Sequence, residues 1–81
     1  MTNKLPILFT TKSCTQCQAL KAQLALNNIE VEIIDAEEHP LKAAEYEVGF
    51  KVPHLVAENG DRFIGGGEGM RYISEILGGK R

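Results

Sequence analysis

The sequence predicts a small α/β domain in which helices pack on a mixed β-sheet, and three observations predict it. Short apolar runs alternate along the chain with segments whose apolar residues recur at helical spacing. The β-α-β unit at the start of the chain requires a parallel, right-handed crossover. The Asn59-Gly60 pair favours a tight hairpin, which makes the last two strands antiparallel. The expected order is strand, helix, strand, helix, strand, strand, helix.

Length and composition allow one domain over residues 1–81 and exclude several classes of protein. The chain has 81 residues, two cysteines and a formal net charge of −2, so it is not a disulfide-rich secreted scaffold. No basic stripe indicates nucleic-acid binding, and no apolar run approaches the roughly 20 residues of a membrane span. Residues 1–6 lack the apolar core of a signal peptide. We therefore expect a cytoplasmic monomer that binds neither nucleic acid nor membranes.

The first half of the chain reads as a β-α-β unit. Leu5–Thr10 is a short apolar run typical of a buried strand, with Pro6 near its start. Residues 11–13 form a polar turn in which Ser13 is the expected helix cap. The helix that follows runs from Cys14 to Asn28, and residues 29–35 form the second strand. The helix should bury one face through Cys17, Leu20, Leu24 and Ala25.

A shorter helix, two strands and a last helix complete the predicted order. The second helix begins at His39-Pro40, continues to about Val48 and is stopped by Gly49, with Leu41, Ala44 and Val48 on its core face. Residues 54–57 and 62–64 form the hairpin strands, and residues 65–67 break the chain. The last helix runs from residue 68 or 69 to Leu77, and residues 78–81 form a frayed tail. The core positions of this helix are Met70, Ile73, Ile76 and Leu77.

The chemistry-bearing residues are Cys14 and Cys17, which lie between the first strand and the first helix. Their spacing places both sulfurs on one face of the first helical turn, close enough for a disulfide. Free backbone N–H groups and the helix dipole at this position favour a thiolate over a thiol. Cys14 lies at the exposed helix start and is the expected attacking thiolate. Cys17 lies on the core face and is the expected resolving thiol.

Two other interpretations of the cysteine pair stay open on the residues alone. The pair can be inert, or it can be part of a metal-binding module that holds zinc or an iron–sulfur cluster. A zinc site needs further ligands, and the two histidines, His39 and His54, have no ligand-like spacing. His54 follows Pro53 and can lie near the cysteines, although an ordinary buried strand histidine is the favoured interpretation. The placement of the pair inside a β-α-β unit favours redox chemistry.

Three landmarks make the chain resemble the glutaredoxins and the related NrdH-type redoxins of the thioredoxin superfamily. These landmarks are Cys14-Thr15-Gln16-Cys17, Val52-Pro53 and Ile64-Gly65-Gly66-Gly67-Glu68, and the match covers nearly the whole chain. The resemblance implies a thioredoxin-like, three-layer β-α-β-α-β-β-α sandwich with a four-stranded mixed sheet. It also implies dithiol–disulfide exchange without a tightly bound cofactor, with glutathione as a co-substrate.

The resemblance further implies a set of binding residues and partners. A cis bond before Pro53 would turn the Val52 backbone toward a disulfide substrate. The Gly66-Gly67-Glu68 turn would hold the γ-glutamyl end of glutathione, with two glycines that permit positive φ. Lys12 and Gln16 complete the implied set. Substrate proteins, with ribonucleotide reductase as the first suggestion, would be reduced at the expense of glutathione or of a thioredoxin reductase.

Several positions depart from the usual glutaredoxin pattern. Thr15-Gln16 replaces the usual Pro-Tyr, and a Gln before the second cysteine is typical of NrdH-type redoxins. Lys51 stands where a Thr usually precedes Val-Pro, and Glu68 stands where an Asp is usual. Against the NrdH interpretation, the chain contains no Trp, so the Trp-containing segment of that group is absent. The sequence therefore leaves the electron donor open.

Overall fold

The computed structural model describes residues 5–49 and 51–78 and contains four strands and three helices within them. The elements follow the predicted order. Their bounds are β1 (Ile7–Thr10), α1 (Thr15–Leu26), β2 (Glu32–Asp35), α2 (Pro40–Glu45), β3 (His54–Val56), β4 (Arg62–Ile64) and α3 (Gly66–Gly78).

The strands form one mixed sheet in the order β2-β1-β3-β4. β1 pairs with β2 in parallel, so Thr10 lies beside Asp35 and both strands end at the same edge. β1 and β3 are antiparallel, with Phe9 opposite His54. β3 and β4 are also antiparallel and form the predicted hairpin. The parallel crossover and the hairpin are both confirmed.

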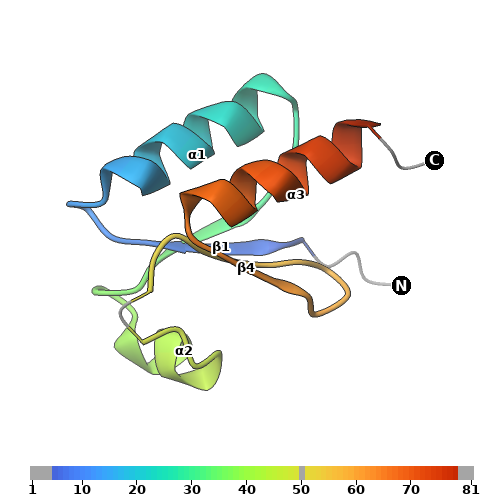
Figure 1. Ribbon diagram of the computed structural model, residues 1–81. Coiled ribbons are helices and arrows are strands. Elements are labelled where there is room, and N and C mark those ends of the chain that lie inside the picture. The colour runs from blue at the N-terminus through green and yellow to red at the C-terminus, as the bar shows by residue number, and fades with distance from the viewer. Residues whose placement is uncertain (1–4, 50, 79–81) are drawn as a thin grey trace.

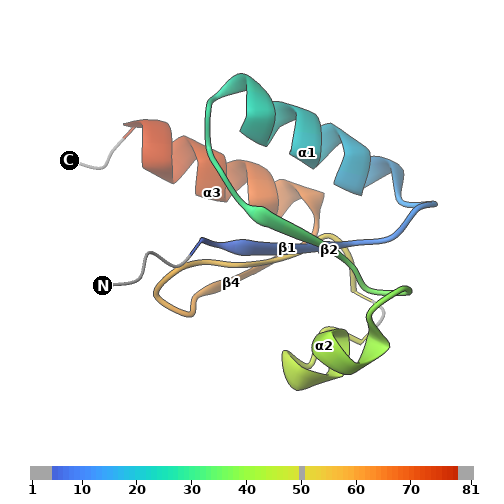
Figure 2. The ribbon, with the colours of Figure 1, turned by 180° about the vertical axis from the view of Figure 1, so that it is seen from behind.

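Three layers result, with α1 and α3 on one face of the sheet and α2 on the other (Figures 1 and 2). Helices can pack on both faces because successive side chains of a strand point to opposite faces of the sheet. Leu8 and Leu55 pack with α1 and α3, whereas Phe9 and Val56 pack on the α2 side. This arrangement confirms the thioredoxin-like sandwich that the resemblance implies.

The first helix begins one residue later than predicted, because Cys14 and not Ser13 is its cap. The sulfur of Cys14 accepts the backbone N–H of Cys17, while Ser13 lies in the exposed turn before it. Three of the residues predicted for the buried face, Cys17, Leu20 and Leu24, are buried. Ala25 is exposed, so its assignment to the core was wrong.

The second helix has a different core face from the predicted one. It ends at Glu45, well before Val48, and Leu41 is 86% exposed. Ala44 is also exposed, and Ala43 is the one residue of this helix that is buried. Val48 is buried as predicted, but from the turn after the helix. A six-residue helix has too few turns for its spacing to fix the buried face.

The last helix begins earlier than predicted and buries a different face. Gly66 and Gly67 form its first turn, and Gly69 packs where a Cβ atom would overlap the Leu20 side chain of α1. The buried residues of α3 are Gly69, Tyr72 and Ile73. The predicted core residues Met70, Ile76 and Leu77 are 44%, 39% and 58% exposed.

The strands are shorter than the apolar runs that predict them. β1 begins at Ile7, β2 begins at Glu32, and β3 ends at Val56. The hairpin turn closes with a hydrogen bond from the Gly60 N–H to the Ala57 carbonyl. The predicted frayed tail begins at Gly78, which instead ends α3, and its remaining residues 79–81 lie outside the described part. Among the described residues, no helix is long and apolar enough to cross a membrane.

Candidate active site

The cysteine pair lies at the edge of the sheet where β1 and β2 both end. The chain leaves β1 at Thr10 and turns so that the Cys14 N–H donates to the Thr11 carbonyl at 3.3 Å. Cys14 then takes an extended conformation as the cap of α1. Its Sγ accepts the Cys17 N–H at 3.0 Å, a bond that satisfies one of the free N–H groups of the first helical turn.

The two cysteines form a disulfide, and their Cα atoms are 5.2 Å apart. Cys14 is half-buried, whereas Cys17 is completely buried on the core face of α1. Only Cys14 can therefore be reached by a large partner. An N–H group aimed at Sγ also stabilises negative charge there once the disulfide is reduced. The difference in burial agrees with the predicted one, and the roles of attacking and resolving sulfur stay predictions.

Lys12 lies two residues before Cys14 and is already paired. Its Nζ is 2.9 Å from a carboxylate oxygen of Glu38, which follows β2. The hydrogen bond and the charge of Glu38 raise the pKa of Lys12. Asp35 holds this loop in place, because its Oδ1 accepts the N–H groups of Glu37 and Glu38. Glu38 is not predictable from the sequence as the partner of Lys12, since no spacing rule links the two segments.

The Val52-Pro53 peptide bond is cis, as the resemblance implies. Pro53 is buried and Val52 is half-buried. The Pro53 carbonyl accepts the Gly65 N–H at 2.7 Å, so the start of β3 is tied to the turn before α3. Gly65 has a φ of +98°, a conformation that favours glycine. Positive φ thus falls on Gly65 and not on Gly66 or Gly67, which are helical.

Gln16 connects the cysteine segment to the start of α3. Its Oε1 accepts the Gly66 N–H at 3.3 Å. A Cβ atom at Gly66 would lie 3.0 Å from that oxygen, so glycine permits this approach. The structure therefore brings together Gln16 and Gly66, two of the predicted binding residues, although they are 50 positions apart.

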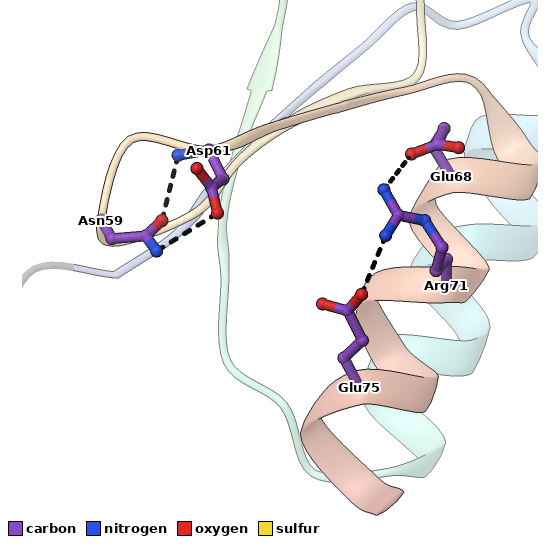
Figure 3. Close-up of polar contacts among 5 residues, drawn as sticks. All are labelled: Asn59, Asp61, Glu68, Arg71 and Glu75. Carbon is purple, nitrogen blue, oxygen red and sulfur yellow. Dashed lines mark hydrogen bonds and ion pairs between the residues drawn. The ribbon is translucent and has the colours of Figure 1, made fainter. Parts of the chain in front are cut away.

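Glu68 is held by Arg71 on the exposed side of α3 (Figure 3). The Arg71 guanidinium lies 2.6 Å from Glu68 and 2.9 Å from Glu75, and it covers the Phe63 ring. The two carboxylates raise the pKa of Arg71. The spacings of three and four residues within one helix are the sequence signal that predicts such pairs.

His54 lies on the α2 side of the sheet, away from the helix that carries the cysteines. It is 2% exposed, and its ring meets the Phe9 ring edge-on at 6.3 Å. Its Nε2 is 3.4 Å from the Arg62 guanidinium, which also donates to the Tyr46 carbonyl. Its Nδ1 has no partner among the described residues. The favoured interpretation of His54, a buried strand histidine, fits this position.

The described residues contain no group of three or more His, Cys, Asp or Glu side chains that could hold a metal ion. The sulfur atoms that would serve as ligands are joined to each other in this structure. The disulfide itself supports chemistry in which the Cys14 to Cys17 bond is made and broken.

The three-layer sandwich, with a cysteine pair at the start of α1, is an α/β arrangement of thioredoxin-like fold. The glutaredoxin family model matches residues 7–63. Since this match covers most of the chain, the protein belongs to the glutaredoxin family. Comparison with curated proteins and comparison with solved structures each gave no significant match. Family and cysteine pair together support a thiol–disulfide redox role.

Proposed function

We propose that the protein is a dithiol–disulfide oxidoreductase that reduces disulfides in other proteins. The observation that carries this proposal is the asymmetry of the cysteine pair, with Cys14 reachable at the helix start and Cys17 buried one turn further. A shallow site of this kind suits a large substrate, because the substrate disulfide need only approach one sulfur.

The reaction proceeds by two exchanges. The Cys14 thiolate attacks one sulfur of the substrate disulfide, forms a mixed disulfide and releases the other sulfur as a thiolate. Cys17 loses its proton and attacks the Cys14 sulfur, which breaks the mixed disulfide and frees the second substrate thiolate. Two electrons pass from the cysteine pair to the substrate, the two substrate thiolates take up protons, and the Cys14 to Cys17 disulfide remains. No tightly bound cofactor takes part.

Glutathione is the proposed donor that resets the pair, and a thioredoxin reductase is the alternative. In the first case, two glutathione thiols are oxidised to one glutathione disulfide as Cys14 and Cys17 are reduced. The proposed glutathione contacts are Lys12, Gln16, Val52, Pro53 and the Gly66-Gly67-Glu68 turn. Ribonucleotide reductase is the proposed protein substrate, which places the reaction in the cytoplasm.

One observation favours the thioredoxin reductase alternative. Three of the polar groups that would hold glutathione are already engaged within the chain. Lys12 is paired with Glu38, the Gly66 N–H with Gln16, and Glu68 with Arg71. Glutathione would have to displace these contacts, whereas a reductase needs only the Cys14 to Cys17 disulfide.

The experiment is a steady-state comparison of two donor systems with insulin as the substrate. One contains glutathione with glutathione reductase, and the other contains thioredoxin reductase, each with NADPH. Turnover with the first system supports the proposed donor, and turnover with the second alone supports the alternative. Absence of insulin reduction with both systems, and with chemically reduced protein, would contradict the proposed function.

A further inference from the structure

Three segments that are far apart in the sequence meet at the edge of the sheet where the cysteine pair lies. The first is residues 14–17, which we call the cysteine segment. The second ends at the cis-proline, Pro53, which the register of β1 and β3 places beside the end of β1. The third is Gly65-Gly66, where α3 begins. In Figures 1 and 2, α1 and α3 accordingly begin at the same end of the molecule.

Two hydrogen bonds from adjacent residues join these segments. The Gly65 N–H donates to the Pro53 carbonyl at 2.7 Å, and the Gly66 N–H donates to Oε1 of Gln16 at 3.3 Å. The first bond joins two backbone groups, whereas the second depends on the side chain of Gln16. Among the described residues, no other hydrogen bond joins the cysteine segment to Pro53 or to the start of α3.

The close approach of Gln16 also accounts for the glycine at position 66. Gly66 is helical and its φ is not positive, so its conformation does not require glycine. A Cβ atom there would lie 3.0 Å from Oε1 and 3.3 Å from Cδ of Gln16. At Gly67, by contrast, no atom lies within 4 Å of an added Cβ. The space beside Gly66 is therefore taken by the Gln16 side chain.

The Gln16 side chain has no packing role in the core. It is exposed, and α1 is anchored instead through the buried Leu20 and Leu24. Loss of the side chain should leave the fold intact and free the cysteine segment to move relative to Pro53. A polypeptide that contacts several segments at once pays for ordering them when it binds. A small disulfide contacts little more than the sulfur of Cys14 and is less affected.

We propose that Gln16 is a positioning residue that holds the cysteine segment in place against Gly66 and Pro53 for the reduction of polypeptide disulfides. This inference rests on the proposed function and adds a determinant of its substrate preference. Gln16 performs this role within the chain, through the Gly66 N–H, and needs no contact with glutathione. Because the link is one hydrogen bond to an exposed side chain, its loss should change a rate constant by about three- to tenfold.

The test measures single-turnover reduction of two disulfides by the reduced protein. One is the symmetric disulfide of an uncharged nine-residue peptide with a central cysteine, and the other is bis(2-hydroxyethyl) disulfide. The measured quantity is the ratio of the two second-order rate constants, peptide over small compound, in which the reactivity of the Cys14 thiolate cancels. We expect Gln16→Ala to lower this ratio about three- to tenfold. Gln18→Ala, at an exposed glutamine of the same helix, is the matched control and should keep the ratio.

Two further variants locate the effect at the bond to Gly66. Gln16→Glu keeps an acceptor oxygen on a side chain of the same length and should retain most of the ratio. Gly66→Ala places a Cβ atom against Oε1 and should lower the ratio as Gln16→Ala does. In the double variant the two losses should not add, because both remove one contact. Additive losses, an unchanged ratio in Gln16→Ala or an equal loss in Gln18→Ala would each overturn the proposal.

The amide proton signal of Gly66 reports the bond without any reaction. In NMR spectra of the oxidised protein, this signal should move upfield in Gln16→Ala, where the acceptor is lost, but not in Gln16→Glu. If it does not move in Gln16→Ala, the proposal fails even though both disulfides are reduced. If the reduced wild-type protein reduces neither disulfide, the proposed function fails and this inference fails with it.

Discussion

The sulfur of Cys14 lies half-buried at a helix start and accepts a backbone N–H, while the sulfur of Cys17 is buried beneath it. Burial disfavours a free thiolate, and an N–H donor favours one. Cys17 can reach only the sulfur of Cys14, which is the sulfur it must attack to release a bound partner. Single-atom substitutions at these two positions should therefore have different effects.

We expect Cys14→Ser to abolish the reduction of insulin, because an alcohol does not replace the attacking thiolate. Cys17→Ser should still attack a substrate disulfide but should not release it, so a covalent complex accumulates. Non-reducing electrophoresis with and without a thiol reductant measures the complex. Trapping by Cys14→Ser instead of Cys17→Ser would reverse the assigned roles.

At the residue scale, the sequence predicts the reactive pair but not the contacts around it. Spacing and position identify Cys14 and Cys17, because both act within one helical turn. The bond between Gln16 and Gly66 joins residues 50 positions apart, and the pair of Lys12 and Glu38 joins two loops. No local rule predicts such contacts. They depend on the relative positions of packed elements.

At the element scale, the packing of α3 on α1 depends on one glycine. Gly69 is buried, and a Cβ atom there would overlap the side chain of Leu20. The helices can approach each other this closely because Gly69 has no side chain. The amphipathic pattern of α3 indicated a helix but favoured Met70, Ile76 and Leu77 for the core, since pattern analysis counts large residues and overlooks a glycine that serves as a contact.

Gly69→Ala should therefore lower the free energy of unfolding by about 1–3 kcal/mol, because the added methyl group forces Leu20 or the helix to move. Gly67→Ala is the matched control in the same helix, since no atom lies within 4 Å of the added Cβ. It should raise stability by roughly 0.5–1 kcal/mol, as alanine restricts the unfolded chain. Urea titration measures both. Equal effects would show that Gly69 is not a packing contact.

At the scale of the whole molecule, the order of elements and the mixed sheet are predictable because they follow from chain-wide patterns. The right-handed crossover places β1 beside β2, and the Asn59-Gly60 turn pairs β3 with β4. The pairing of β1 with β3 has no such local signal. Residue patterns likewise do not predict the cis bond before Pro53. The expectation of a cis bond rested on the resemblance to the glutaredoxins.

The two faces of the sheet also differ in the side chains that are buried on them. The α1 and α3 side is packed with aliphatic and aromatic side chains, whereas the α2 side encloses a histidine. Burial lowers the pKa of His54, and the nearby charges of Arg62 and Lys51 lower it further. The aromatic ring that packs against His54 is that of Phe9, which carries no charge.

This burial makes the stability of the whole domain depend on pH. Because the folded-state pKa of His54 lies below its ordinary value of 6.5, the unfolded chain binds a proton more readily than the folded one. Stability is then fully present above about pH 6.5 and falls as the pH drops toward the folded pKa, by at most about 1.4 kcal/mol per pH unit.

Urea unfolding between about pH 7 and pH 5, above the titration of most carboxylates, measures this fall. His54→Gln should lower stability at neutral pH, because its shape differs from that of the buried ring, but it should flatten the decline. His39→Gln, at an exposed position, should keep the wild-type decline. An unchanged slope in His54→Gln would show that proton binding at the α2 face does not couple to unfolding.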